Sequence, residues 1–85
     1  MSFKARRSEK FKKAFKALTK KDAPLNLRLR KKMEQILEHP ENHDMKMGNL
    51  KGVYGVHVNP YVILYRIVGD VVEFLLMDHH DNIYK

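Results

Sequence analysis

The 85 residues suffice for a modest hydrophobic core, and residues 1–85 are expected to form a single domain. No cysteine is present, which excludes disulfide bonds and thiolate metal sites. The longest apolar runs, such as residues 61–65, are far shorter than the ~20 residues that span a membrane. Residues 1–11 also lack the apolar segment of a secretory signal, so a cytoplasmic protein with no membrane contact is expected.

The formal net charge of +7 is concentrated in the first half of the chain. Residues 1–39 hold thirteen Lys and Arg and four Asp and Glu, a net charge of +9, whereas residues 40–85 hold four and six, a net charge of −2. A basic half favours a polyanionic partner, either nucleic acid or an acidic protein segment. A solvated, lysine-rich helix surface would have the same composition, and charge alone does not separate these interpretations.

Two helices are predicted in the basic half. Residues 2–5 precede them and are too short to assign, although a brief edge strand would fit. Ser8 can cap a first helix, whose apolar stripe is formed by Phe11, Ala14, Phe15 and Leu18. After a link at residues 20–23, Pro24 suits the start of a second helix that runs to about residue 38, before Pro40. The buried edge of this helix consists of Leu25, Leu29, Met33, Ile36 and Leu37. An antiparallel helix hairpin is expected, followed by a polar loop at residues 39–49.

Three strands are predicted at residues 53–58, 61–68 and 71–78, which are rich in β-branched and aromatic side chains. Gly69–Asp70 fits a two-residue hairpin turn with glycine first. Asn59–Pro60 fits such a turn less well, because proline cannot adopt a positive φ. A four-residue loop is therefore expected there, and it would leave the alternation of the strands unchanged.

Alternation along these strands predicts two faces. The face expected to pack on the helices is entirely apolar or aromatic and comprises Tyr54, Val56, Val58, Tyr61, Ile63, Tyr65, Ile67, Val72, Phe74 and Leu76. The other face comprises Val53, Gly55, His57, Val62, Leu64, Arg66, Val68, Val71, Glu73, Leu75 and Met77. On it, Arg66 and Glu73 should form a cross-strand pair, and His57 should be accessible. The fold class is thus α+β, with a helix hairpin packed on one face of a small twisted antiparallel sheet.

Histidines inside or just after the strands suggest acid–base chemistry. Imidazole exchanges protons near neutral pH, and His57, His79 and His80 all lie in this part of the chain. Beside a basic half, they make cleavage of an RNA phosphodiester the first hypothesis. Three histidines without a carboxylate spacing motif do not indicate zinc, so no metal or other cofactor is expected.

Three motifs in the second half resemble the RelE/ParE superfamily of type II toxins. Residues 48–52, Gly-Asn-Leu-Lys-Gly, are similar to the G-x-L-x-G segment of the YoeB and RelE branches. Residues 56–60 with 63–65 resemble the HVxP…ILxY segment of the YafQ branch, and residues 79–84 match the HHxxIY ending of the family. The resemblance covers nearly the whole chain. It implies a RelE-like fold, metal-independent cleavage of mRNA on the ribosome, and a cognate antitoxin that neutralises the toxin.

The resemblance also assigns candidate catalytic residues. His57 aligns with a catalytic histidine of the YafQ branch, although it could be a strand histidine filling partly exposed space. His80 aligns with the C-terminal catalytic histidine, whereas strict strand alternation would instead place His79 beside His57, so His79 is kept as the reserve candidate. Tyr84 would stack on a base or orient the attacking oxygen, or would simply anchor the tail to the sheet.

Further candidates would bind substrate. The cations proposed as phosphate clamps are Lys46, Lys51 and Arg66, of which Arg66 could equally serve only to pair with Glu73. His43 lies in the loop where the YafQ branch keeps another histidine. The lysines of the predicted helices could contact ribosomal RNA or bind an acidic antitoxin.

Two alternatives remain open. ParE-branch members act on DNA gyrase, so the chain could bind gyrase without nuclease chemistry. Val62 stands where the RelE branch has an arginine, and Tyr61–Val62 replaces the acidic residue and tryptophan of the YafQ branch. The chain could therefore also be an inactive module that binds nucleic acid.

Overall fold

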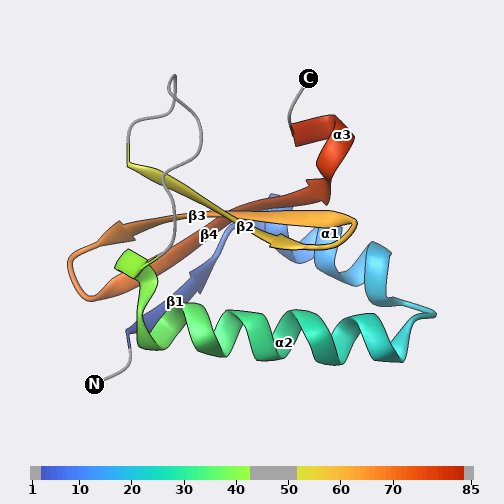
Figure 1. Ribbon diagram of the computed structural model, residues 1–85, viewed down its shortest axis with the longest axis horizontal. Coiled ribbons are helices and arrows are strands. Elements are labelled where there is room, and N and C mark those ends of the chain that lie inside the picture. The colour runs from blue at the N-terminus through green and yellow to red at the C-terminus, as the bar shows by residue number, and fades with distance from the viewer. Residues whose placement is uncertain (1–2, 43–51, 84–85) are drawn as a thin grey trace.

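The computed structural model describes residues 3–42 and 52–83, in which helices cover one face of a four-stranded sheet (Figure 1). The elements are β1 (Lys4–Arg7), α1 (Glu9–Thr19), α2 (Ala23–Glu38), the 3-10 turn η1 (Pro40–Asn42), β2 (Val53–Val58), β3 (Tyr61–Val68), β4 (Val71–His79) and α3 (His80–Ile83). The strand order is β1-β4-β3-β2. The predicted α+β class is confirmed, but the sheet is mixed, because β1 runs parallel to β4.

Both long helices begin at a capping side chain, and the predicted cap Ser8 is confirmed. The Ser8 hydroxyl accepts a hydrogen bond from the Phe11 amide at 3.0 Å and donates one to the Leu75 carbonyl oxygen at 2.6 Å. The Asp22 carboxylate accepts from the Leu25 amide at 3.0 Å at the start of α2. Each cap satisfies an amide that the helix itself leaves without an acceptor. The cap of α1 also fixes this helix to β4.

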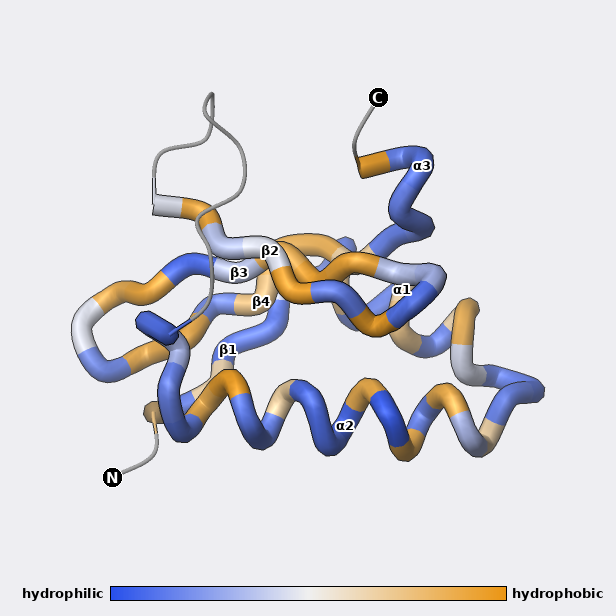
Figure 2. The backbone as a smooth tube through the Cα atoms, in the orientation of Figure 1, coloured by the Kyte–Doolittle hydropathy of each residue, from blue (hydrophilic) through white to orange (hydrophobic). Residues whose placement is uncertain are grey.

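The core lies between the sheet and the two helices. Phe11 and Phe74 are fully buried with their ring centroids 5.3 Å apart, and Leu29 and Ile36 bring α2 into the same cluster. Figure 2 shows hydrophobic and hydrophilic stretches alternating along α2, as expected for a helix with one buried side. Among residues 3–42 and 52–83, no helix is both long enough and apolar enough to cross a membrane.

Both hairpin connections contain two residues. Gly69 has a φ of 62° and precedes Asp70, as predicted for a turn with glycine first. The predicted four-residue loop at Asn59 is wrong, because Val58 pairs directly with Tyr61 across a cis Asn59–Pro60 peptide bond. Both loop lengths are even, so the predicted faces of β2 and β3 are unchanged.

A β-bulge corrects the predicted faces of β4. Phe74 pairs with Tyr65 and Leu76 pairs with Leu64, so Leu75 is an extra residue on β4. The alternation beyond it is therefore reversed. Met77, predicted on the outer face, is almost fully buried beneath the helices, and Leu76 moves to the outer face.

The outer face of the sheet carries a smaller apolar cluster. Val53, Val62 and Leu64 form its buried centre, and Ile83 of α3 packs against it. In Figure 1 α3 stands on the side of the sheet opposite α2. Part of this face is thus covered by the C-terminal helix.

Candidate functional site

The structure brings the rings of His57 and His80 together. His57 is exposed on β2 and pairs with Val62, on the outer face of the sheet as predicted. His80 is the first residue of α3, and its amide donates a 2.9 Å hydrogen bond to the Pro60 carbonyl oxygen at the β2–β3 turn. This bond fixes the start of α3 to the hairpin that carries His57. The two ring centroids are 5.4 Å apart and the ring planes are inclined by 34°.

His79 lies on the other face from His57. Because of the bulge in β4, Asp78 now pairs with Val62 and shares the face of His57, whereas His79 pairs with Tyr61. The rings of His79 and Tyr61 meet edge to face with centroids 6.0 Å apart. Strict alternation, which would place His79 beside His57, is therefore wrong. Of the two adjacent histidines, His80 is the one brought next to His57.

Hydrogen bonds at the end of β4 position α3. The Asp78 Oδ1 atom accepts from the His79 amide at 2.7 Å and from Asn82 Nδ2 at 3.1 Å. The exposed Asp81 carboxylate lies 3.6 Å from His80 Nδ1. Within residues 3–42 and 52–83, no three His, Asp or Glu side chains are arranged to hold a metal ion.

A basic groove adjoins His57. It has a volume of about 370 Å³ and runs between α2 and the edge strand β2. We call it the α2–β2 groove, and its lining residues are Arg28, Lys31, Lys32, Gln35, His57, Val58 and Asn59. The Arg28 Nη2 atom donates a 2.9 Å hydrogen bond to the Asn59 carbonyl oxygen and so connects the two walls. The sequence suggested RNA contacts for the helix lysines as a group but did not single out this groove, although the i, i+3, i+4, i+7 spacing of its four α2 residues forms one polar stripe.

Arg66 is engaged away from the histidines. Its Nε atom lies 2.6 Å from the Glu73 carboxylate, as the predicted cross-strand pair requires, and Arg6 approaches the same carboxylate at 3.6 Å. Arg66 is four residues along β3 from Val62, the partner of His57, which corresponds to roughly 13 Å. Arg66 is therefore separated from the histidine pair, and its position does not support its predicted role as a phosphate clamp.

Four predicted site residues lie outside the described residues, namely His43, Lys46, Lys51 and Tyr84. Residues 48–51 of the G-x-L-x-G motif do so as well. Their assigned roles stay predictions.

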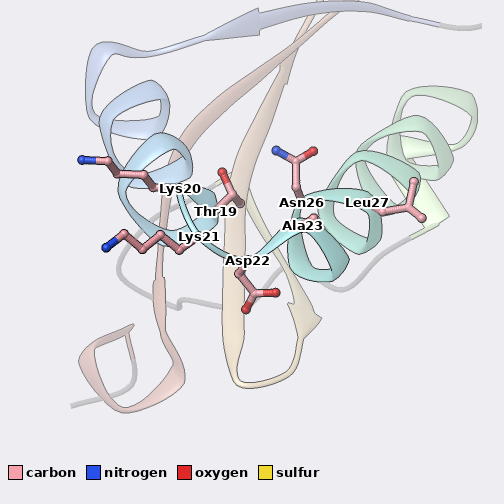
Figure 3. Close-up of a pocket in the computed structure, with 7 residues that line it drawn as sticks. All are labelled: Thr19, Lys20, Lys21, Asp22, Ala23, Asn26 and Leu27. Carbon is pink, nitrogen blue, oxygen red and sulfur yellow. The ribbon is translucent and has the colours of Figure 1, made fainter.

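A larger cavity of about 540 Å³ lies at the link between α1 and α2. Figure 3 shows Lys20 and Lys21 pointing away from Asp22 and Asn26, so the polar groups do not converge on one point. The Asp22 carboxylate is already occupied in capping α2. This cavity contains no imidazole and has no connection to the histidine pair.

Comparison with known proteins identifies the family. Residues 4–84 match the family described as the ParE toxin of the type II toxin–antitoxin system parDE. The chain belongs to the RelE/ParE superfamily of type II toxins. Toxin RelE4 of Methanocaldococcus jannaschii is 33% identical over 76 residues, which cover 86% of this chain and 81% of that protein.

Solved structures of RelE/ParE toxins share the fold of this chain. The Escherichia coli RelBE toxin–antitoxin complex matches with a TM-score of 0.78 at 18% identity, over 92% of this chain and 96% of that one. The E. coli DinJ–YafQ complex also gives a TM-score of 0.78 at 18% identity, over 98% and 99% of the two chains. At such low identity these similarities establish the RelE-like fold and not the chemistry.

Proposed function

We propose that this toxin is an endoribonuclease that cleaves mRNA, with His57 and His80 as the proton-transfer pair. The observation that carries the proposal is the 5.4 Å separation of the two rings, contributed by residues far apart in the sequence. The basic first half of the chain supports a nucleic-acid substrate.

The reaction needs one base and one acid. One imidazole accepts the proton of the RNA 2′-hydroxyl as this oxygen attacks the adjacent phosphorus. The P–O5′ bond breaks, and the other imidazole donates a proton to the departing 5′-oxygen. The products are a 2′,3′-cyclic phosphate and a 5′-hydroxyl. DNA lacks the attacking hydroxyl, so it is not cleaved.

The ring separation constrains where the phosphate sits. At 5.4 Å between centroids the rings are too close for a phosphate group to lie between them. The phosphate instead lies across both rings, on the exposed side of the pair. There each ring can bring one nitrogen within about 2.6–3.2 Å of one reacting oxygen.

The partners in this proposal are a cognate antitoxin, mRNA and the ribosome. The RelBE and DinJ–YafQ structures are complexes of a toxin with its antitoxin, which supports an antitoxin partner for this chain. The cations of α2 would provide the electrostatic attraction to ribosomal RNA.

The test is RNA cleavage by His57→Ala and His80→Ala variants in an in vitro translation reaction with mapped cut ends. Each substitution should lower the cleavage rate by about 10²–10⁴-fold and leave the thermal unfolding transition unchanged. His39→Ala is the matched control, because it removes an exposed imidazole at the C-terminal end of α2. Full cleavage by the double variant His57→Ala/His80→Ala would refute the proposal.

A second candidate is inhibition of DNA gyrase, because the matched family is that of ParE toxins. This function needs no pair of imidazoles. Expression of the His57→Ala/His80→Ala variant would then still arrest growth, with DNA damage and intact transcripts. Loss of growth arrest together with loss of mRNA cleavage would exclude it.

A further inference from the structure

We propose that the α2–β2 groove binds the phosphate backbone of the RNA next to the cleaved linkage. This inference rests on the proposed nuclease function. It extends the RNA-binding site from the cleaved linkage to the neighbouring phosphates of the same strand. The groove begins at His57, which forms part of its wall and is also one of the two paired rings. An RNA strand whose phosphate lies over the pair therefore meets this groove as soon as it crosses the edge strand β2.

The charges of the groove suit a polyanion. Arg28, Lys31 and Lys32 line it, and none of the lining residues within 3–42 and 52–83 carries a carboxylate. Arg28 and Lys32 are four residues apart on α2, a rise of about 6 Å along the helix axis. The cations therefore lie at successive levels along the groove, where they can contact successive phosphates of one strand.

The side chains that line the groove also indicate which part of the RNA it recognises. Apart from His57, no lining residue in the described part of the chain has an aromatic ring on which a base could stack. Contacts from lysine and arginine to phosphates fix the position of a strand without reading its sequence. The groove should therefore strengthen RNA binding to a similar degree for any sequence, with a strong dependence on salt.

An acidic protein segment is the competing occupant, because its carboxylates would match the same cations. RNA is favoured because the groove shares His57 with the site at which the phosphodiester is proposed to react. The experiment must separate the two occupants.

The test compares two variants with equal loss of charge. Lys31→Gln/Lys32→Gln removes two cations from the groove, and Lys13→Gln/Lys16→Gln removes two exposed cations from α1, none of whose residues lines the groove. Binding to a short single-stranded RNA, blocked against cleavage by 2′-O-methyl groups, is measured by fluorescence anisotropy between about 50 and 200 mM salt. Thermal unfolding confirms that both variants are folded.

Two lost phosphate contacts should weaken RNA binding roughly 25-fold at about 0.1 M salt and reduce the slope of log K against log salt by about 1.4. The α1 variant should retain the affinity and slope of the unaltered protein. Equal losses in both variants would mean diffuse attraction to a basic surface and would overturn the inference. So would unchanged RNA binding by the groove variant, or a loss restricted to an oligoglutamate peptide titrated in parallel.

The outcome is independent of the nuclease test, because the RNA is not cleaved. Loss of cleavage in the histidine variants with unchanged RNA binding by the groove variant refutes only the groove. Groove-dependent RNA binding by a protein that does not cleave RNA refutes only the nuclease proposal.

Discussion

Tyr65→Phe should destabilise the fold by removing one buried hydrogen bond. Tyr65 is fully buried in β3, and its hydroxyl donates a 2.6 Å hydrogen bond to the Pro40 carbonyl oxygen in η1. Phenylalanine keeps the ring but leaves this buried carbonyl without its donor, at a cost of about 1–3 kcal/mol. A domain of this size has a total stability of roughly 4–13 kcal/mol, so the loss is substantial. Each kcal/mol of unfolding free energy that is lost should lower the Tm by about 4–8 °C.

The same substitution should change how stability depends on pH. Burial, with smaller contributions from Tyr54 and Glu41, raises the pKa of the Tyr65 hydroxyl far above its ordinary value of 10.0. Above pH 10 the unfolded chain therefore loses a proton that the folded chain retains. The contribution of this group to stability is complete below pH 10, and it falls by up to about 1.4 kcal/mol per pH unit as the pH rises further. The Tyr65→Phe variant has no hydroxyl at this position that could lose a proton. The difference in free energy of unfolding between this variant and the unaltered protein should therefore become smaller above pH 10.

Urea unfolding at about pH 7, 10 and 11 measures both effects. Tyr61→Phe, at a half-buried position on the same strand, is the matched control and should show a smaller deficit at pH 7. A Tyr65→Phe variant as stable as the unaltered protein at pH 7 would show that the hydrogen bond to Pro40 contributes nothing. A deficit that stays constant up to pH 11 would refute the argument from burial.

Three other substitutions test the packing of the core, the cap of α1 and the position of α3. Phe11→Ala leaves a cavity at a fully buried position and should cost about 3–5 kcal/mol in chemical denaturation. Ser8→Ala removes the cap of α1 and should cost about 0.5–2 kcal/mol, with reduced helicity by circular dichroism; an unchanged free energy of unfolding would contradict the cap. Asp78→Ala removes the acceptor for the His79 amide and Asn82, so α3 should shift and carry His80 out of place. RNA cleavage should then fall by up to about 10²-fold through the rate constant while RNA affinity holds, and a loss of affinity alone would contradict this role.

Local signals in the sequence predict most of the elements. Ser8 provides the cap of α1, and Pro24 and Pro40 mark the start and end of α2 within one or two residues. The exposure of His57 follows from alternation, because both hairpin connections are even in length. These features depend on residues close together in the chain, which is why they can be predicted.

The missed features depend on contacts between distant segments. The bulge at Leu75 is defined only by the pairing of β4 with β3, and it reverses the faces of Leu76 and Met77. Alternation alone selected His79, whereas the family resemblance selected His80, whose ring the structure brings beside His57. The α2–β2 groove requires α2 to lie beside an edge strand, and the polar stripe of a single helix does not reveal its neighbour.

The most direct measurement of the central claim is cleavage of an mRNA with one 2′-O-methyl nucleotide at the mapped cut site. If His57 and His80 move protons during attack by the 2′-oxygen, the modified message should remain intact at that site. The unmodified message should yield a 2′,3′-cyclic phosphate and a 5′-hydroxyl. Equal cutting of both messages, or products that end in a 3′-hydroxyl, would contradict the account.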